Sequence, residues 1–424
     1  MSAYETKLYP PEAIDRKRHM VATYLVETSE GFSFDKVGGA IATELSTGTW
    51  TSVHAETPKL QRKSRAKVIR NEKLGKENGR ETVLSQIAFP VENISERGGI
   101  GLIMTTFGGN AFGMSDFRNF RVIDLELPKR IVSRFNGPNF GIEGVRKILE
   151  TEKSRRPHLG TIVKPNVGLT PSEFQDIVYE AAAGGVDFVK DDELLVDPDY
   201  CPIEERAAAA SEALDRGEDE TGRRALYACN ITDRADRIVD TAQDAIDNGA
   251  PFLMVNVITA GFSALRALAE ANLDVPIHVH RNFHAAFTRD SKHGVKMRVI
   301  AKLVRMAGGD QLHTGTAAGK MEGQGGEVRM INDFLRGDWH GLKTTFPVAS
   351  GGIHPGLVKR NIEVLGNDIV IQAGGGIHGH PDGTRSGAKA MRQAIESSMK
   401  GRSIEDYAET HEELKKAIEY WGTA

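Results

Sequence analysis

The segment GGVDFVKDDE, residues 184–193, places a lysine and three acidic residues directly after a short apolar run. The run 186–189 has the pattern of a short buried strand, so Lys190 and the acids stand where that strand would end. Asp192 and Glu193 offer the hard oxygen ligands that Mg²⁺ prefers, but two carboxylates are few for a magnesium site. Lys190 cannot ligate as an ammonium, whereas its carbamylation by CO₂ would add an anionic oxygen. The alternative is a simple ion pair between Lys190 and Asp192.

Further reactive side chains follow other apolar segments of the chain. They include two lysines, an arginine and three histidines, namely Lys164, Lys320, Arg281, His280, His284 and His313. Two glycine-rich turns, Ser350-Gly351-Gly352 and Gly374-Gly375-Gly376, have the composition of turns that bind phosphate through backbone N–H groups. Arg281 and His313 are suited to hold a second anionic group.

Strand, loop and helix patterns alternate through the C-terminal two thirds of the chain. The eight apolar segments are 159–163, 186–189, 226–229, 252–258, 275–279, 311–313, 346–349 and 369–373. Helical patterns lie between them, and this alternation predicts an α/β fold with a parallel (β/α)₈ TIM barrel. The C-terminal ends of barrel strands meet at one mouth, so the reactive side chains are expected to converge there. Residues 403–422 predict an amphipathic helix outside the barrel.

The first 150 residues predict a separate α+β domain of ferredoxin-like type, so the expected domains are 1–150 and 151–424. Within it, Glu44, Thr49, Trp50 and Asn110 cannot be told from structural residues by sequence alone. The expected elements are a strand at 20–28, a short helix at 37–45, a second strand at 48–56, a solvated loop at 59–80, and a buried strand with a glycine-rich turn at 99–114.

The composition is that of an ordinary globular protein, with 40% hydrophobic and 26% charged residues. A net charge of −4 and a pI near 6.4 give no sign of a nucleic-acid or membrane surface. The two cysteines, Cys201 and Cys229, indicate packing roles in a reducing compartment. No apolar run is long enough for a membrane helix, so a cytoplasmic location is expected.

Six motifs in order resemble the active-site motifs of the ribulose bisphosphate carboxylase (RuBisCO) large-subunit superfamily. They are GTIVKPNVGLT, GGVDFVKDDE, HVHRNFHAAFTR, HTGTAAGKMEG, ASGGIHPG and QAGGGIHGHP. The resemblance implies that Lys190 is carbamylated and forms the Mg²⁺ site with Asp192 and Glu193. It implies that Lys164 is the acid/base lysine of enolisation, and that Lys320 is a mobile-loop lysine that meets a CO₂-derived carboxylate.

The resemblance also implies roles for the remaining residues. His280 is implied as a further catalytic group, beside His284 in the same motif. One implied phosphate site comprises Arg281, His313 and Ser350, and the other comprises Thr49, Trp50, Gly351, Gly374 and Gly375, with Gly352 in the same turn. Glu44 and Asn110 match residues that reach into the barrel of a neighbouring subunit, which implies a homodimer with shared active sites, or a higher oligomer built from it.

Departures from the family pattern bear on the reaction. Carboxylating members have a lysine where this chain has Asn166, and an asparagine where it has Leu194. These changes resemble RuBisCO-like proteins, which apply the enolising machinery to other phosphorylated substrates. The retained Lys320 favours a substrate with a carboxyl group. The sequence thus predicts a carboxy-lyase that decarboxylates, or transcarboxylates and hydrolyses, a β-keto sugar-acid phosphate of the 3-oxo-isoapionate 4-phosphate type.

Three alternatives stay open. The first is a methionine-salvage enolase or isomerase of a methylthio-sugar phosphate, and the second is a divergent ribulose-bisphosphate carboxylase. The third, a non-enzymatic binding protein, is disfavoured because Lys190, Asp192 and Glu193 are all present.

Overall fold

The computed structural model describes residues 4–319 and 325–423, and the chain divides into two compact units. The N-terminal unit comprises Met1–Phe135 and Phe283–Leu303, and the barrel unit comprises Asn136–Asn282 and Val304–Ala424. Within the described residues, no helix combines the length and the apolar character that a membrane span requires.

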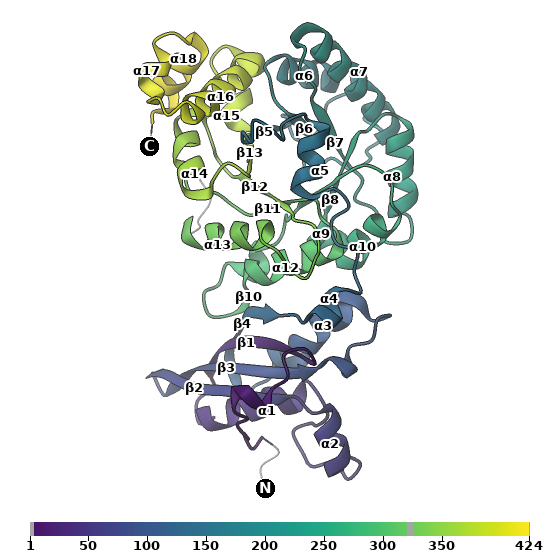
Figure 1. Ribbon diagram of the computed structural model, residues 1–424, viewed down its shortest axis with the longest axis vertical. Helices are drawn as coiled ribbons and strands as arrows, with labels where there is room; N and C mark the ends of the chain where they lie inside the picture. Colours follow the sequence, from purple (N-terminus) through teal and green to yellow (C-terminus); the bar gives the residue numbers. More distant parts are fainter. Residues whose placement is uncertain (1–3, 320–324, 424) are drawn as a thin grey trace. The chain divides into compact units, whose positions relative to one another are not determined.

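A five-stranded sheet forms the centre of the N-terminal unit (Figure 1). Its order is β10-β4-β1-β3-β2, with β1 antiparallel to both β3 and β4. The strands are β1 (His19–Thr28), β2 (Lys67–Glu77), β3 (Arg80–Pro90), β4 (Phe117–Glu126) and β10 (Gly294–Val295). The helices are α1 (Val37–Glu44), α2 (Pro58–Ser64), α3 (Gly99–Phe107), α4 (Lys129–Val132) and α11 (Ala285–Thr288). The expected strand at 20–28 and helix at 37–45 are confirmed as β1 and α1.

Three expectations for this unit are wrong. Residues 59–80 are not a solvated loop, because they contain most of α2 and the whole of β2. The apolar run from Gly99 is the helix α3 rather than a strand, and residues 48–56 form no strand. Apolar runs of this length fit a strand or a buried helix equally well. The β-branched residues of 48–56 are mostly exposed, so no packing supports a strand there.

Eight parallel strands close into the predicted barrel in the order β11-β12-β13-β5-β6-β7-β8-β9 (Figure 1). They are β5 (His158–Ile162), β6 (Phe188–Lys190), β7 (Leu226–Asn230), β8 (Phe252–Asn256), β9 (Ile277–His280), β11 (Gln311–His313), β12 (Phe346–Ser350) and β13 (Val370–Gln372). All eight coincide with the segments expected from the sequence, although β8 ends at Asn256 and Val257 already begins α9.

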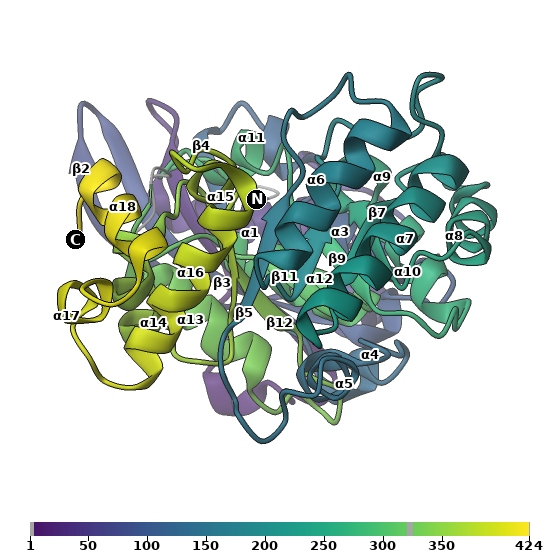
Figure 2. The ribbon, with the colours of Figure 1, turned by 90° about the horizontal axis from the view of Figure 1, so that it is seen from above.

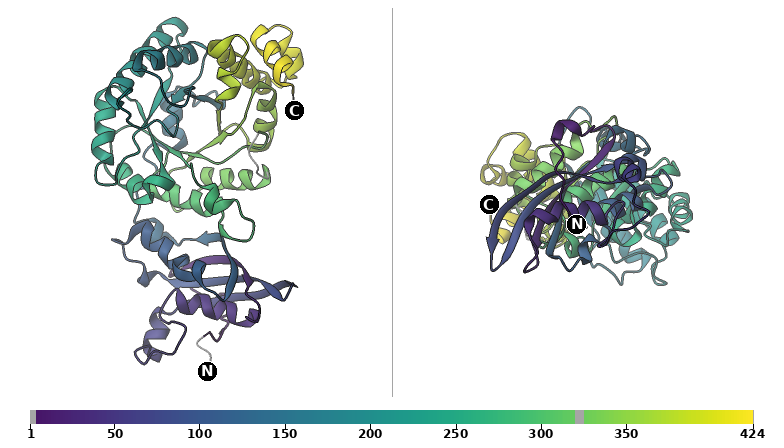
Figure 3. Two further views of the ribbon diagram at one scale, coloured as in Figure 1. Left: turned by 180° about the vertical axis from the view of Figure 1, so that it is seen from behind. Right: turned by 90° about the horizontal axis from the view of Figure 1, so that it is seen from below.

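Helices surround the barrel strands, as the view from behind shows (Figure 3). They are α6 (Pro171–Ala183), α7 (Ile203–Thr221), α8 (Ile238–Asp247), α9 (Val257–Ala260), α10 (Phe262–Glu270), α12 (Met297–Ala307), α13 (Gly325–Arg336), α14 (Val358–Leu365), α15 (Gly375–His378) and α16 (Gly383–Met399). The sequence fixes some of their ends: Thr170 and Glu173 form a capping box at the start of α6, with Pro171 in its first turn. The single helix expected at 403–422 is two, α17 (Ile404–Ala408) and α18 (Glu412–Trp421), and α18 packs beside α16 (Figure 2).

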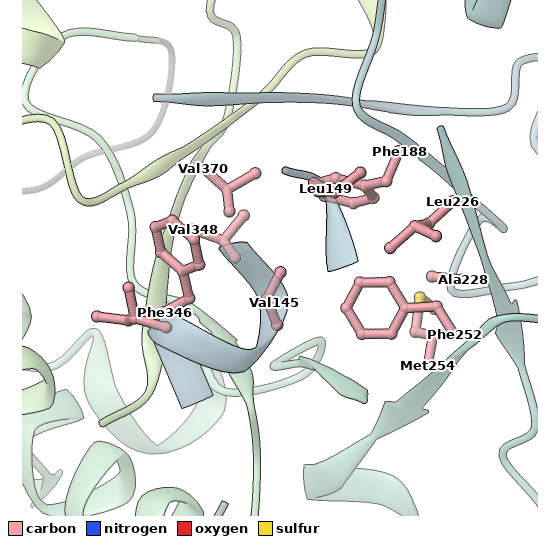
Figure 4. Close-up of a cluster of buried hydrophobic side chains, with 11 residues drawn as sticks. Val145, Leu149, Phe188, Leu226, Ala228, Phe252, Met254, Phe346, Val348 and Val370 are labelled. Carbon is pink, nitrogen blue, oxygen red and sulfur yellow. The ribbon is translucent and has the colours of Figure 1, made fainter. Parts of the chain in front are cut away.

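The helix α5 (Gly141–Ile148) fills one end of the barrel with apolar side chains (Figure 4). Val145 and Leu149 pack against residues that begin barrel strands, namely Phe188, Leu226, Phe252, Phe346 and Val370. These contacts close the N-terminal end of the barrel with an apolar core. Reactive side chains at the strand ends therefore belong to the opposite end, where barrels hold their active sites.

Candidate active site

Lys190 is the last residue of β6, and it is completely buried. Its Nζ donates to the backbone oxygen of Asp191 at 2.8 Å and lies 3.8 Å from Glu193 Oε2. Burial lowers the pKa of Lys190 to about 8, although Glu193 and Asp192 oppose the shift. A substantial fraction of this side chain is therefore a neutral amine near pH 8, which is the form that reacts with CO₂.

Lys164 approaches the same carboxylates from the neighbouring strand. It follows β5, and its Nζ lies 2.6 Å from Asp192 Oδ2. Asp192 is almost fully buried, whereas Lys164 is about one-third exposed. Lys164 Nζ also donates to Asn166 Oδ1 at 2.8 Å, so the residue that departs from the family pattern contacts the proposed acid/base lysine. The sequence left open an ion pair between Lys190 and Asp192; in the structure Lys164 pairs with Asp192, and Lys190 pairs with Glu193.

Two buried asparagines hold the loop that carries the acids. Asn230, at the end of β7, donates from Nδ2 to the backbone oxygen of Asp192 at 3.3 Å. Asn256, at the end of β8, donates to the backbone oxygen of Glu193 at 3.0 Å. The sequence reasoning missed both residues. Their signal is an asparagine that ends an otherwise apolar strand, because a buried amide at that position needs hydrogen-bond partners.

A second cluster lies at the ends of β9, β11 and β12. His280 Nε2 lies 3.7 Å from Glu193 Oε2, and its ring centroid lies 4.5 Å from that of His313. His313 Nδ1 lies 2.6 Å from Ser350 Oγ. Burial lowers the pKa of Arg281 to about 10 and that of His313 well below its ordinary value. The structure thus links the acids to the predicted anion-binding residues His313 and Ser350 through His280.

The two predicted glycine turns lie against each other. Gly351 and Gly352 have φ angles of 120° and 74°, a backbone region that favours glycine. A Cβ atom on Gly376 would lie 2.1 Å from the backbone oxygen of Ile353, so only glycine permits this contact between the turns. A Cβ on Gly374 would lie 3.3 Å from Lys164 Cε, which places this turn beside the acid/base lysine. Gly375 begins α15 directly after it.

The four residues singled out in the N-terminal unit line one hollow of about 640 Å³. They are Glu44, Thr49, Trp50 and Asn110, accompanied by Tyr4 and Asp116. The Trp50 side chain is 74% exposed, which is unusual for a large aromatic residue. The sequence could not distinguish these residues from structural ones, whereas the structure gathers them on one surface.

Two other predicted site residues have different outcomes. His284 is the N-cap residue of the short helix α11, and its Nδ1 lies 2.8 Å from Thr288 Oγ1, a local contact within one turn. Lys320 lies outside the described residues.

The oxygen donors at the end of β6 fit a magnesium ion only with a modified lysine. Within residues 4–319 and 325–423, no three His, Cys, Asp or Glu side chains are grouped as metal ligands. Asp192 and Glu193 supply two carboxylates, and the third nearby group is the buried Nζ of Lys190. A carbamate on Lys190 would convert that nitrogen-bearing side chain into an oxygen donor and complete a set that suits Mg²⁺.

Comparisons with known proteins agree along nearly the whole chain. Residues 7–131 match the ribulose bisphosphate carboxylase large chain, N-terminal domain, and residues 141–421 match its catalytic domain. A relative in Methanocaldococcus jannaschii named ribulose bisphosphate carboxylase is 44% identical, covering 92% of this chain and 95% of its own length. One in Pyrococcus furiosus with the same name is 41% identical, covering 95% and 94%.

Solved structures show the same similarity. Octameric Rubisco from Pyrococcus horikoshii, in complex with a sulfate ion, superposes with a TM-score of 0.91 at 39% identity, covering 99% of this chain and 96% of that one. Dimeric archaeal Rubisco from Hyperthermus butylicus superposes with a TM-score of 0.89 at 39% identity, covering 98% of each chain.

Proposed function

The chain belongs to the ribulose bisphosphate carboxylase large-chain family, and from that membership we propose that it is a Mg²⁺-dependent enzyme that enolises a phosphorylated sugar. After enolisation, it makes or breaks a bond to a carboxyl carbon. The observation that carries this proposal is the fully buried Lys190 beside Asp192 and Glu193, because a carbamate on this lysine would complete a set of oxygen donors for a metal.

Activation begins at Lys190. Its neutral amine attacks CO₂, a nitrogen–carbon bond forms, and one amine proton leaves to solvent. The product is an anionic carbamate that would hold Mg²⁺ together with Asp192 and Glu193. Bound Mg²⁺ would polarise a substrate carbonyl and lower the cost of removing the neighbouring proton.

Proton transfer falls to groups of this chain. Lys164 lies beside Asp192 and the Gly374 turn, so its Nζ is placed to give or take a proton where a substrate meets the acids. The carbamate of Lys190 is the other candidate base. His280, 3.7 Å from Glu193, is placed to hold a substrate hydroxyl at the same position. Lys320 meets the carboxyl group in this scheme, as the family resemblance implies.

Two sets of hydrogen-bond donors support the proposal that the substrate carries an anionic group at each end. Arg281, His313 and Ser350 form one proposed phosphate site. The glycine turns at Gly351 and Gly374 supply backbone N–H groups for the other, to which Thr49 and Trp50 of a neighbouring chain would add. The substrate class is therefore a sugar or sugar acid that carries phosphate.

The direction of the carbon–carbon step is the finer part of the proposal. Asn166 and Leu194 replace residues of the carboxylating pattern, and Asn166 contacts Lys164 directly. This favours cleavage of a β-keto sugar-acid phosphate, by decarboxylation or by transcarboxylation and hydrolysis. Carboxylation of ribulose 1,5-bisphosphate is the second candidate, favoured by relatives with that name at 37–44% identity over nearly their whole length.

A homo-oligomer follows from the same family membership. The related structures are dimeric and octameric, and we propose that the unit of function is a homodimer. Glu44 and Asn110 of one chain would complete the barrel site of the other. Their shared exposed hollow supports this role, because it gathers polar side chains without an obvious structural purpose.

Product analysis tests the proposal. The protein is incubated with Mg²⁺, bicarbonate and ribulose 1,5-bisphosphate, and 3-phosphoglycerate is measured; in parallel, CO₂ release from β-keto sugar-acid phosphates is measured. CO₂ release without 3-phosphoglycerate supports cleavage, whereas 3-phosphoglycerate formed at a catalytic rate establishes carboxylation instead. Enolisation of methylthio-sugar phosphates alone would point to the isomerase alternative. A Lys190→Ala protein serves as the inactive control in every arm.

A further inference from the structure

A chain of hydrogen bonds inside the barrel ends at Ser350. Gln311 Oε1 lies 2.8 Å from His278 Nδ1, at the buried end of the chain. His278 Nε2 lies 2.8 Å from His313 Nε2, and His313 Nδ1 lies 2.6 Å from Ser350 Oγ. The first three side chains are buried, whereas Ser350 is half-buried at the end of β12. The chain thus leads from the barrel interior to the proposed phosphate site.

Strand register produces this alignment. In the parallel pair β9 and β11, Gln311 stands opposite His278. Alternate side chains of a strand share a face, so His313 points into the barrel with Gln311. On the other side of β11, His313 pairs with Val348, two residues before Ser350. None of these positions depends on a flexible loop.

The chain of bonds has a direction. Burial lowers the pKa of His278 to about 3 and that of His313 well below its ordinary value, so both rings are neutral. A neutral imidazole has one N–H donor and one acceptor nitrogen. Because the two rings meet Nε2 to Nε2, one ring must donate and the other must accept. This choice sets which Nδ1 carries a proton, and so it sets the direction of the hydrogen bonds to Gln311 and to Ser350.

The two directions have different consequences at Ser350. In the first direction, the Gln311 oxygen accepts a hydrogen bond from His278 Nδ1–H, and the Ser350 hydroxyl donates its hydrogen to His313 Nδ1. Gln311 Nε2 then has no partner among the described residues. In the second, the Gln311 amide is turned by 180° and donates to His278, so His313 Nδ1–H donates to Ser350. The hydroxyl hydrogen of Ser350 is then free. The two amide orientations are nearly identical in shape.

We propose that Gln311 and His278 are positioning residues that hold the chain in the second direction, so that Ser350 donates its hydroxyl hydrogen to an anionic group of the substrate. The second direction pairs one buried N–H of Gln311, while the amide oxygen takes the place that has no partner, and it offers an anion a donor in place of a lone pair. This role rests on the proposed function, which assigns Ser350 to a phosphate site. Neither Gln311 nor His278 touches that site itself.

Nuclear magnetic resonance of the full chain labelled with ¹⁵N-histidine reads the direction without any substrate. The expected result is a proton on His313 Nδ1 and on His278 Nε2, with assignments made from His278→Asn and His313→Gln proteins. A proton on His313 Nε2, or two protons on either ring, overturns the proposal. The measurement does not depend on enzyme activity. If the protons are on the other ring nitrogens, this inference is wrong while the proposed function is unaffected.

A pair of matched variants tests the role of Gln311. Gln372 is a second buried glutamine of the barrel, on β13, and its amide atoms have no partners among the described residues. Gln311→Met should weaken the binding of inorganic phosphate about tenfold, the value of one hydrogen bond to a charged group, and move the His313 proton to Nε2. Gln372→Met should change neither. An unchanged His313 proton in Gln311→Met overturns the role of Gln311. Failure of the native protein to bind phosphate while its histidines carry the expected protons would instead contradict the proposed phosphate site.

Discussion

Lys164 and Asp192 form an ion pair of 2.6 Å that joins the ends of two neighbouring barrel strands. The proposed acid/base group and a proposed metal ligand therefore occupy one electrostatic unit. Asp192 is almost fully buried, so the ammonium of Lys164 supplies most of the positive charge that its carboxylate needs. A metal ion at this place must compete with that ammonium.

Replacing Lys164 with Met should therefore strengthen metal binding while it abolishes proton transfer. Without the competing ammonium, Asp192 is left to the cation, and the affinity for Mg²⁺ should rise about fivefold or more, a coupling of about 1 kcal/mol. Titration calorimetry with Mg²⁺ in the presence of CO₂ checks the affinity. Lys164→Arg, which keeps the charge, should bind Mg²⁺ as the native chain does. Weaker binding in Lys164→Met would show that Lys164 supports the metal site.

Carbamylation should be confined to Lys190. The protein treated with ¹³CO₂ and Mg²⁺ is expected to show a carbamate carbon resonance that is absent in Lys190→Ala, and that variant should lose Mg²⁺-dependent turnover. A contrasting residue is Lys302, also buried, whose Nζ donates to Asp124 at 2.6 Å and to the backbone oxygen of Leu125 at 2.7 Å. Lys302→Arg should keep the resonance. Full activity in Lys190→Ala would eliminate the carbamate.

The contact between Asn166 and Lys164 gives a test of the departure from the carboxylating pattern. Asn166→Lys would place a second ammonium beside Lys164 in an exposed position, where two unit charges about 5 Å apart repel by about 1 kcal/mol. The pH profile of substrate proton exchange should shift downward by about 0.5–1 unit. Asn166→Leu removes the acceptor without adding charge and should not produce this shift. A gain of carboxylation in Asn166→Lys would identify this position as the cause of the altered reaction.

Much of the barrel could be predicted from the sequence because its strands are buried on both faces and read as short apolar runs. Lys190 and the acids were visible because each follows such a run. The edge strand β2 was not visible: only Val68 and Ile69 on it are buried, and most of its remaining residues are charged and exposed. An edge strand needs no apolar alternation, and exposed charges on it prevent aggregation.

Other features depend on contacts that no local pattern contains. The apolar run of α3 satisfies the requirements of a strand and of a helix, and only packing decides between them. Asn230 and Asn256 act by bonding to backbone oxygens more than thirty positions away in the chain. The direction of the Gln311 chain depends on strand register and on burial together.

Shared active sites predict complementation between inactive chains. Lys190→Ala and Asn110→Ala homodimers should each be inactive, because one lacks the proposed metal ligand and the other the residue donated to its neighbour. Chains refolded together should recover about a quarter of native activity, since random pairing makes half of the dimers mixed and each mixed dimer holds one intact site. A mixture of Lys190→Ala with Asp192→Ala is the matched control and should recover nothing. If neither mixture recovered activity, Asn110 would belong to the active site of its own chain or to no active site.

Buried imidazoles should make the protein lose stability between pH 7 and pH 5.5. Burial lowers the pKa values of His158 and His278 to about 3 and that of His378 to about 4, against about 6.5 in an unfolded chain. As the pH falls below 6.5, these imidazoles bind protons in the unfolded chain but stay neutral in the folded chain. The free energy of unfolding therefore decreases as the pH falls. Each imidazole contributes about 1 kcal/mol to the loss over this interval.

His158 isolates one such contribution, because its Nε2 lies 2.7 Å from Thr151 Oγ1 and glutamine can replace that hydrogen bond. His158→Gln should reduce the fall in unfolding free energy between pH 7 and 5.5 by about 1 kcal/mol, measured by urea denaturation at one protein concentration. His54→Gln provides the control, because the His54 side chain is exposed. Two buried carboxylates do not alter the comparison between the native protein and His158→Gln. Arg392 and Arg156 hold the pKa of Asp187 far below its ordinary value, so its stabilising contribution is lost only at much lower pH. Burial raises the pKa of Asp310 to about 6, and this group titrates in both proteins. If the unfolding free energy of His158→Gln fell with pH as steeply as that of the native protein, the His158 imidazole would accept a proton in the folded protein. Burial and the charges of Arg156 and Arg392 would then not keep it neutral.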